Sequence, residues 1–323
     1  MNSKAMCLAG VLFFGGGFQT LASTTNNIST QSSAEYQILA DQALLQHLGV
    51  QAEQVTFDGQ VGYAKLDAFK LGQLHQLAHE NGKCGGFELV DSAEPMKSLN
   101  AALLKTQKSQ RSLNTLPIAI PERAEVRAVV SGFQTSELRD VVTWLSNYPS
   151  RYHNLPDPNV HVQDMVAKLN GLLASYAFPK SVEMINHRRT PQKSIRVTLT
   201  GKSNPSQIVV LGGHFDSIVQ WAPRKAPGAD DNASGSANIL QALEGFLSLG
   251  VQPERTLEFY WYAGEEAGLL GSAEIAADYK SQGKNVVAAL QLDMTLFPAD
   301  GEFVMGSIAD YTDPWLRNFL TEI

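Results

Sequence analysis

The chain has 323 residues, of which 44% are hydrophobic and 18% charged, and its formal net charge is −7. This composition can form a large packed core and excludes a chain that is disordered throughout. A mildly acidic chain without basic runs is a poor candidate for nucleic-acid binding. Its two cysteines cannot form a disulfide framework or a cysteine-rich zinc site. The length predicts about two domains.

The N-terminus has the order of a secretory signal peptide. Lys4 is followed by the apolar stretch 5–18 and then by the small residues Ala22 and Ser23. The apolar stretch is shorter than the about 20 residues that span a bilayer. We therefore expect residues 1–23 to be a signal peptide and no stable membrane anchor, and the protein to be secreted, extracellular or periplasmic in transit. A buried N-terminal helix is the alternative.

Residues 24–97 predict a small α+β domain. Apolar periodicity indicates the helices, and Asp58-Gly59 is a strong signal for a hairpin. The expected elements are a helix over 34–48, a strand pair over 55–63, a helix over 68–78 and a strand over 86–90.

A polar segment that leads into a proline-rich one follows at 98–124, and this composition is typical of a linker. A signal, a small domain, an exposed linker and a larger domain together have the organisation of a proenzyme. We therefore interpret 24–97 as a propeptide domain and 98–124 as a linker with a processing site for an activating protease. An ordinary accessory domain is the alternative.

Residues 125–323 predict an α/β domain, because strands alternate with helices and the neighbouring strands are then largely parallel. Apolar runs bounded by glycine or polar residues mark most of the elements. The expected helices are near 136–145, 162–176, 236–249, 269–282 and from 313, and the expected strands are near 181–185, 194–200, 208–211, 256–262 and 286–292.

Each of three core strands leads directly into residues that can bind a metal. The first ends at His214 and Asp216, the second at Glu265 and Glu266, and the third at Asp293. Parallel strands bring their carboxyl ends to one edge of a sheet, where ligand sites form. The sequence therefore predicts that one imidazole and several carboxylates converge in one crevice.

A further acidic pair, Asp230-Asp231, lies in the loop before helix 236–249. Mixed nitrogen and oxygen donors favour a divalent metal, zinc above all. Two ions about 3.5–4 Å apart need a bridging carboxylate, and their joint field lowers the pKa of a water between them.

The spacing within each segment suggests a division of roles. His214 and Asp216 are two residues apart in an extended segment, so we expect the Asp216 carboxylate to hold the ring N–H of His214. Glu265 and Glu266 point in different directions, so one can bind metal while the other moves protons. Each feature also has a structural alternative, such as a helix cap or dipole partner. The shared sheet edge makes a functional site the stronger interpretation.

Four segments resemble the secreted bacterial leucyl aminopeptidases, a family of di-zinc exopeptidases. They are Gly-Gly-His214-Phe-Asp216-Ser, Gly-Ala-Asp-Asp231-Asn-Ala-Ser-Gly, Ala-Gly-Glu265-Glu266-Ala-Gly-Leu-Leu-Gly-Ser and Leu-Gln-Leu-Asp293-Met-Thr. The resemblance extends from about residue 125 to the end. It implies a three-layer α/β/α fold with a central mixed, largely parallel sheet, and a signal with a cleaved propeptide.

The resemblance also implies roles for single residues. His214 and Asp293 would bind one zinc, Glu266 the other, and Asp231 would bridge both. Glu265 would be the general base.

Three further implications of the resemblance concern the substrate and the loop. Met294 would neighbour the substrate pocket. The substrate would be a peptide N-terminus, often with Leu or another large apolar residue. The Asp231–Asn232 peptide bond would be cis.

The chain departs from the family in one respect. The family's last zinc ligand is a histidine downstream of the Asp293 segment, whereas all seven histidines here lie at or before position 214. The chain also stops within an apparent helix. We therefore expect a C-terminal part with this fifth ligand, the remaining pocket wall and the family's disulfide to be missing.

The sequence thus predicts a secreted aminopeptidase proenzyme, a monomer with two Zn²⁺ in the complete catalytic domain. Metal-activated water would attack the peptide bond. The alternatives are a carboxypeptidase or another di-zinc amidohydrolase of the same clan, and a non-catalytic secreted binding protein that retains the fold.

Overall fold

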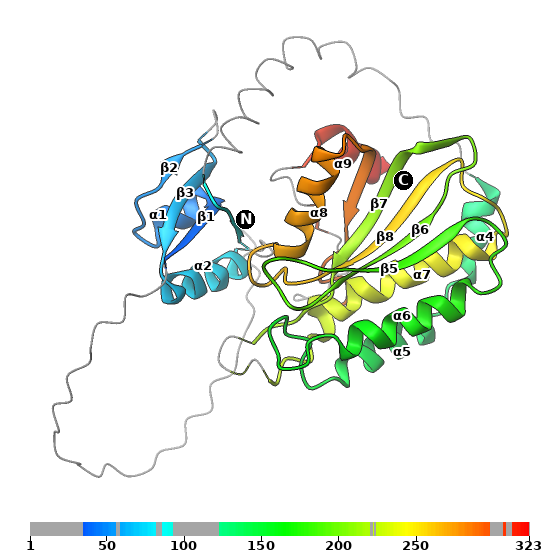
Figure 1. Ribbon diagram of the computed structural model, residues 1–323, viewed down its shortest axis with the longest axis horizontal. Coiled ribbons are helices and arrows are strands. Elements are labelled where there is room, and N and C mark those ends of the chain that lie inside the picture. Colours follow the sequence, from blue (N-terminus) through cyan, green and yellow to red (C-terminus); the bar gives the residue numbers. More distant parts are fainter. Residues whose placement is uncertain are drawn as a thin grey trace, which may run out of the picture.

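The fold comprises two sheets, each with helices and an apolar core of its own (Figure 1). The segments 1–23 and 98–122 and both cysteines, with the expectations attached to them, lie outside the described residues. The computed structural model describes residues 35–55, 59–81, 86–92, 123–219, 222, 224–297, 306–307 and 312–322.

The N-terminal unit is a four-stranded antiparallel sheet with strand order β2-β3-β1-β4 and two helices. This βαββαβ order is a common α+β arrangement. The expected helix over 68–78 and strand over 86–90 are present. The elements are β1 (Tyr36–Asp41), α1 (Gln42–His47), β2 (Glu53–Gln54), β3 (Val61–Leu66), α2 (Ala68–Glu80) and β4 (Phe87–Leu89).

The prediction of one helix over 34–48 is wrong in its first half, where β1 forms the centre of the sheet. Ile38, Leu39 and Ala40 are all buried, because both faces of this strand are covered. A strand covered on both faces loses its alternation and resembles a helical stripe. The helix begins only after Asp41, whose side chain accepts hydrogen bonds from the N–H groups of Ala43 and Leu44.

The hairpin signal at Asp58-Gly59 predicts the correct pairing but not the correct strand limits. β2 and β3 pair antiparallel, with Glu53 opposite Tyr63. β2 therefore ends before residue 55, and β3 extends beyond residue 63.

The C-terminal unit is built on a mixed five-stranded sheet with order β5-β6-β8-β7-β9. β7 pairs parallel with both β8 and β9, while β5, β6 and β8 pair antiparallel. The elements are α4 (Ala124–Gly132), α5 (Thr135–Ser146), α6 (Val160–Leu173), β5 (Lys180–Ile185), β6 (Ser194–Leu199), β7 (Asn204–His214), the irregular turn η1 (Ala229–Ser234), α7 (Gly235–Ser248), β8 (Arg255–Tyr262), α8 (Leu270–Ser281), β9 (Asn285–Gln291) and α9 (Pro314–Glu322).

Helices cover both faces of this sheet. α5, α6 and α7 pack on one face, where Trp261 and Phe259 belong to the main core. α8 packs on the other face through Ile275, against Ile208 and Tyr260. The predicted mixed three-layer fold is therefore confirmed, with every expected helix and strand of this unit in place. The sequence did not predict α4, which lies at the end of the expected linker.

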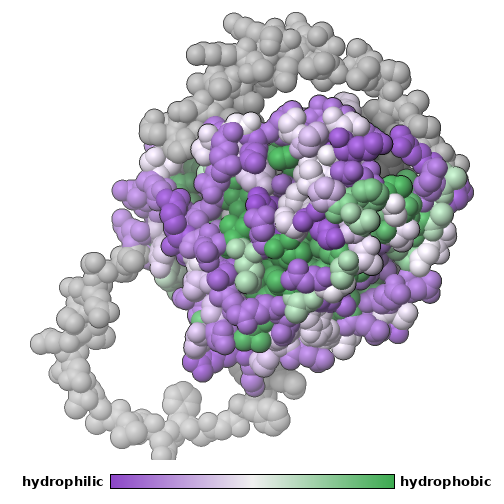
Figure 2. Space-filling model, turned by 45° about the vertical axis from the view of Figure 1, so that its right-hand side comes forward, coloured by the Kyte–Doolittle hydropathy of each residue, from purple (hydrophilic) through white to green (hydrophobic). Residues whose placement is uncertain are grey.

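Among the described residues, β5 and β9 are the two edge strands of this sheet. Val286 and Val287 in β9 are 39% and 44% exposed. Figure 2 shows apolar side chains gathered near the middle of one face and surrounded by polar ones. In the part of the chain that the structure describes, no helix has the length and apolar character to span a bilayer.

Candidate metal centre

The carboxyl ends of β7, β8 and β9 meet at one edge of the sheet. His214 is the last residue of β7 and pairs with Tyr262, the last residue of β8. Gly212 pairs with Gln291 at the end of β9. Because the three strands run in parallel, the residues that follow each of them enter the same space.

Three predicted ligands lie around one point. His214 Nε2 is 2.9 Å from Asp231 Oδ1 and 3.3 Å from Asp293 Oδ1. One donor atom from each residue lies within 4.8 Å of the others, and His214 is almost completely buried. The structure thus brings together an imidazole nitrogen and two carboxylate oxygens, as the sequence predicts.

The donor atoms of this cluster fit a cation. The Nδ1 atom of His214 lies 3.1 Å from the backbone carbonyl oxygen of Asp216, which can only accept, so Nδ1 carries the ring proton. Within the described residues, His214 Nε2, Asp293 Oδ1 and Glu266 Oε2 are buried and have no hydrogen-bond partner. Each such buried atom destabilises a fold by about 1–3 kcal/mol. A zinc ion binds the same nitrogen and carboxylate donors, and would satisfy these atoms.

The Asp216 carboxylate has a role beyond the expected contact with the ring of His214. This carboxylate accepts hydrogen bonds from the backbone N–H groups of Glu265 at 3.0 Å and Glu266 at 3.2 Å. Its Oδ1 atom is 3.5 Å from His214 Nδ1, farther than the carbonyl oxygen. The carbonyl is thus the nearer partner of the imidazole, and the carboxylate positions the loop that carries both glutamates.

The charges of the centre are coupled. Burial raises the pKa values of Glu265 and Glu266 well above their usual range, and neighbouring carboxylates raise them further, against an opposing influence of His214. Burial acts to lower the pKa of His214, but Asp293 and Glu265 raise it well above its usual value. A cluster with this excess of buried carboxylates is suited to a bound cation or to proton transfer.

The turn η1 directs Asp231 and Asp230 to different partners. Asp231 faces His214, and the Asp231–Asn232 peptide bond is cis, as the resemblance implies. Asp230 Oδ1 accepts a hydrogen bond from the N–H of Leu296 at 2.8 Å. Asp230 therefore holds the segment after β9.

Arg151 supports the centre, and the sequence analysis missed it. The completely buried guanidinium donates to four carbonyls, including those of Phe215 and Gly228 at 3.0 Å each. Burial lowers its pKa to about 10. Arg151 thus joins the end of β7 to the turn that carries Asp231. A single arginine in a loop has no periodicity or spacing by which this role could be recognised.

Gln192 extends this support to the glutamate loop. Its Nε2 donates to the Arg151 carbonyl at 3.1 Å, and its Oε1 accepts from the N–H of Gly264 at 3.1 Å. Gly264 immediately precedes Glu265. The ligand-bearing loops are therefore connected through buried polar side chains.

Met294 follows Asp293 and is 38% exposed, with a left-handed backbone (φ +44°). Its expected place beside the substrate pocket stays a prediction.

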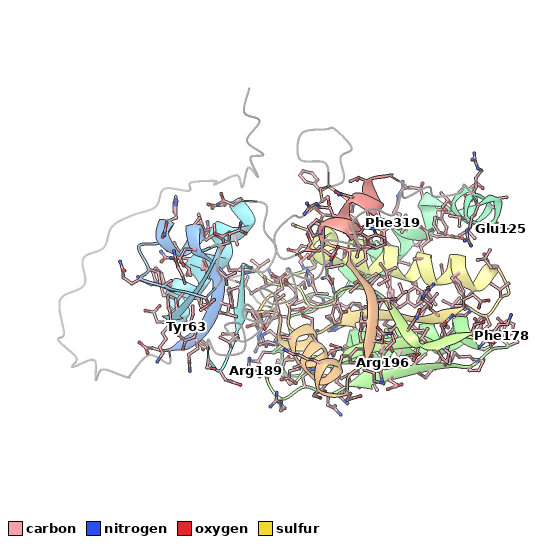
Figure 3. The ribbon with its side chains drawn as sticks, turned by 90° about the horizontal axis from the view of Figure 1, so that it is seen from above. Tyr63, Glu125, Phe178, Arg189, Arg196 and Phe319 are labelled. Atoms are coloured by element: carbon pink, nitrogen blue, oxygen red, sulfur yellow. The ribbon has the colours of Figure 1, made fainter. Side chains whose placement is uncertain are left out.

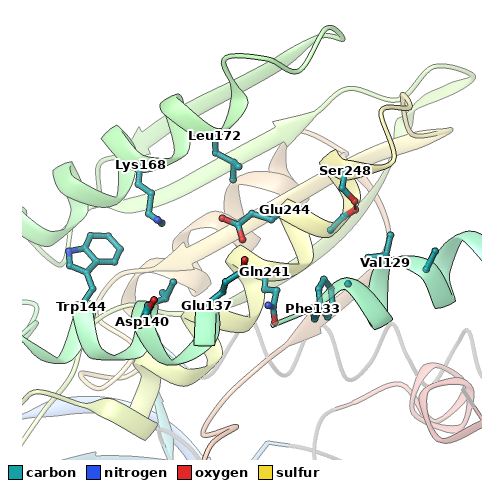
Figure 4. A pocket seen from close by; sticks show the side chains of 14 residues that line it. Val129, Phe133, Glu137, Asp140, Trp144, Lys168, Leu172, Gln241, Glu244 and Ser248 are labelled. Carbon is teal, nitrogen blue, oxygen red and sulfur yellow. Dashed lines mark hydrogen bonds between the residues drawn. The ribbon is translucent and has the colours of Figure 1, made fainter. Parts of the chain in front are cut away.

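A cavity of about 760 Å³ lies elsewhere, between α4, α5, α6 and α7, where Figure 4 shows Trp144, Lys168 and Glu244 around it. None of the predicted site residues lines this cavity. The candidate site therefore remains the cluster at the sheet edge, and this cavity is separate from it.

An imidazole and carboxylates gather here at the carboxyl ends of parallel strands, where α/β domains bind ligands. The C-terminal unit is therefore an α/β domain with a candidate metal centre at the sheet edge. Residues 194–322 match the family model described as Peptidase family M28.

Several curated relatives are named as leucine aminopeptidases. A probable leucine aminopeptidase of Trichophyton verrucosum is 39% identical over 208 residues, which are 63% of this chain and 56% of that protein. Leucine aminopeptidase 1 of Colletotrichum graminicola is 32% identical over 249 residues, 73% of this chain and 60% of that protein. The chain thus spans less than two thirds of the length of these relatives.

Solved structures agree on the fold. The LapA aminopeptidase of Legionella pneumophila superposes with a TM-score of 0.69 at 23% identity, over 90% of this chain and 79% of that chain. LapB of the same organism has a TM-score of 0.63 at 21% identity, over 81% of this chain and 71% of that chain. These two structures show a shared fold.

Proposed function

We propose that the chain is a secreted zinc aminopeptidase proenzyme that removes the N-terminal residue, Leu or another large apolar one, from peptides. The observation that carries this proposal is the cluster of His214, Asp231 and Asp293, with donor atoms within 4.8 Å of one another. The family match and the leucine aminopeptidase relatives support the reaction type.

The residues divide between two zinc ions. His214 and Asp293 would hold the first ion, Glu266 the second, and Asp231 both. The mixed nitrogen and oxygen donors suit zinc. When bound, a zinc pair would polarise the scissile carbonyl and make water a stronger nucleophile near neutral pH.

Glu265 is the residue suited to moving the proton. Burial raises the pKa of its carboxyl well above the usual range. This carboxyl would take a proton from the attacking water and return one to the departing amine. The N–H of Glu265 donates to Asp216, which holds the loop while the side chain changes protonation. Met294 contributes to the pocket for the apolar side chain of the substrate.

Replacement of the base tests this assignment. We expect Glu265→Gln to keep its zinc but to lose about 10²–10⁴-fold in kcat, since the variant cannot accept the proton. The assay is release of p-nitroaniline from leucine p-nitroanilide, with the zinc content measured in parallel. Glu254→Gln is the matched control, because Glu254 is largely exposed and makes only a 4.0 Å surface ion pair. Full turnover by Glu265→Gln would refute the assignment.

The alternatives give different results in the same experiments. A carboxypeptidase would cleave peptides whose N-terminus is blocked and would not cleave those with a blocked C-terminus. A non-catalytic binding protein would hydrolyse neither kind.

The N-terminal segments complete the proposal. Residues 1–23 would direct export, and cleavage within 98–124 would separate the N-terminal unit as a propeptide. The mass and N-terminal sequence of the protein recovered from culture medium test both cuts.

A further inference from the structure

A histidine of the N-terminal unit reaches the metal centre. His75 lies in α2, and its Nε2 atom is 3.3 Å from Glu266 Oε2. The two side chains are 8% and 1% exposed. This places a second imidazole against the predicted ligand of the second ion, from a part of the chain 191 positions earlier in the sequence.

Backbone contacts hold the N-terminal unit in this position. The N–H of Leu89 in β4 donates to the carbonyl of Gly268, two residues after Glu266, at 3.3 Å. Arg189 donates to the carbonyl of Leu89 at 2.6 Å and forms a 2.5 Å ion pair with Asp91. Figure 3 shows Arg189 at the junction of the two units.

Close packing at Gly268 reinforces this contact. Gly268 has φ +99°, and a Cβ atom there would lie 2.6 Å from the Phe87 ring. The glutamate loop is therefore shaped to receive β4.

The separation of the two donor atoms is that of ligands on one ion. Donors about 2.0–2.1 Å from a tetrahedral zinc lie roughly 3.3–3.4 Å apart. The His75–Glu266 pair is separated by 3.3 Å, the same as His214 Nε2 and Asp293 Oδ1. In the described part of the chain, Glu266 Oε2 is buried and no partner meets hydrogen-bond geometry, so without a metal the contact is an ion pair only if His75 is protonated.

We propose that His75 is a metal ligand, which binds through Nε2 the ion that Glu266 holds. The N-terminal unit then closes the centre by coordination, and a peptide N-terminus cannot reach this ion until His75 leaves. The inference rests on the proposed two-metal function, but it concerns the ligand set and is measurable without a substrate.

Loading the protein with cobalt(II) allows the histidine ligands to be observed by ¹H NMR. In the cobalt-loaded full chain, each imidazole bound through Nε2 gives one exchangeable ring N–H signal with a strong paramagnetic shift in the ¹H NMR spectrum. We expect two such signals in the parent, from His214 and His75, and one in His75→Ala and His75→Gln. His47→Ala is the matched control, because His47 is exposed on the same unit, and it should keep both signals.

Metal affinity provides a second measurement. Loss of a residue that only supports a ligand costs 10–100-fold in affinity, so loss of the ligand itself should weaken the second cobalt ion by about 100-fold or more. The remaining His214 signal shows that the variants are folded. His75→Gln keeps a polar side chain next to Glu266, and it separates coordination from a simple polar contact.

The proposal is overturned if the parent shows only the His214 signal, if it binds no second cobalt ion, or if either His75 variant binds that ion as tightly as the parent. Failure of the proposed function is a different result. Two imidazole signals in the full chain, with no hydrolysis of any peptide after cleavage within 98–124, would support His75 coordination and refute the aminopeptidase. A chain that hydrolyses peptides but shows only the His214 signal would support the aminopeptidase and refute His75 coordination.

Discussion

His161 in α6 is held in its neutral form by hydrogen bonds that lead to the Glu265 loop. Gln192 Oε1 accepts from the N–H of Gly264, which orients the amide so that its NH₂ group faces His161 Nε2 at 2.9 Å. His161 Nε2 must therefore accept a hydrogen bond, and a proton on it would meet the amide N–H. Burial, followed by the charge of Arg151, lowers the pKa of His161 to about 3, against a weaker opposing influence of Asp216.

This shift makes the folded state less stable in acid. The pKa of His161 falls from 6.5 in the unfolded chain to about 3 in the fold, so the unfolded state binds the extra proton. The contribution of neutral His161 to the free energy of unfolding is therefore fully present above pH 6.5, and it is lost as the pH falls from there toward 3. Between pH 7 and pH 5, protonation of this one residue in the unfolded state lowers the free energy of unfolding by about 2 kcal/mol.

Urea unfolding of the metal-free protein at pH 7 and pH 5 measures this effect. His161→Gln removes the titrating group and keeps an acceptor for Gln192. The free energy of unfolding of the parent should fall between the two pH values by about 2 kcal/mol more than that of the variant. His47→Gln, at an exposed histidine, should behave as the parent. Equal losses in the parent and His161→Gln would refute the reasoning.

Two further predictions concern the residues that support the centre. Asp216→Asn replaces one of the oxygens that accept from Glu265 and Glu266 by an NH₂ group, so zinc affinity should fall about 10–100-fold in competition with a chelator; unchanged affinity would contradict this role. Arg151→Lys leaves several buried carbonyls without a donor, so the free energy of unfolding should fall by about 3 kcal/mol or more. A thermal melt like that of the parent would show that lysine can replace these donors.

The ligands at the strand ends could be predicted because the signal is local. His214 is the last residue of β7, and Asp293 follows the last residue of β9 by two positions. Once parallel pairing is assumed, these short connections leave little freedom for where the side chains can lie. The same reasoning did not predict that the Asp216 carboxylate accepts from the N–H groups of Glu265 and Glu266, because these partners are 49 and 50 positions away.

The supporting residues could not be predicted because their contacts are remote in sequence. Arg151 donates to a carbonyl 77 positions away, and His75 lies in a different unit from Glu266. Neither residue stands in a pattern of spacing that indicates a partner. The error over 34–48 has another cause, since β1 is covered on both faces and its apolar run fits a strand and a helix equally well.

The spacing of the ligands depends on backbone contacts that only small residues allow. The N–H of Leu292 donates to the carbonyl of Gly212 at 2.8 Å, and Asn232 donates to the carbonyl of Leu292 at 3.0 Å. A Cβ atom at Gly213 would lie 2.8 Å from that same Leu292 carbonyl.

Any side chain at Gly213 would therefore push the segment after β9 away from β7. Asp293 and the turn with Asp231 would then move away from His214, because Leu292 and Asn232 link them to this segment. Gly213, which directly precedes His214, is thus part of the metal centre, although it contributes no ligand atom.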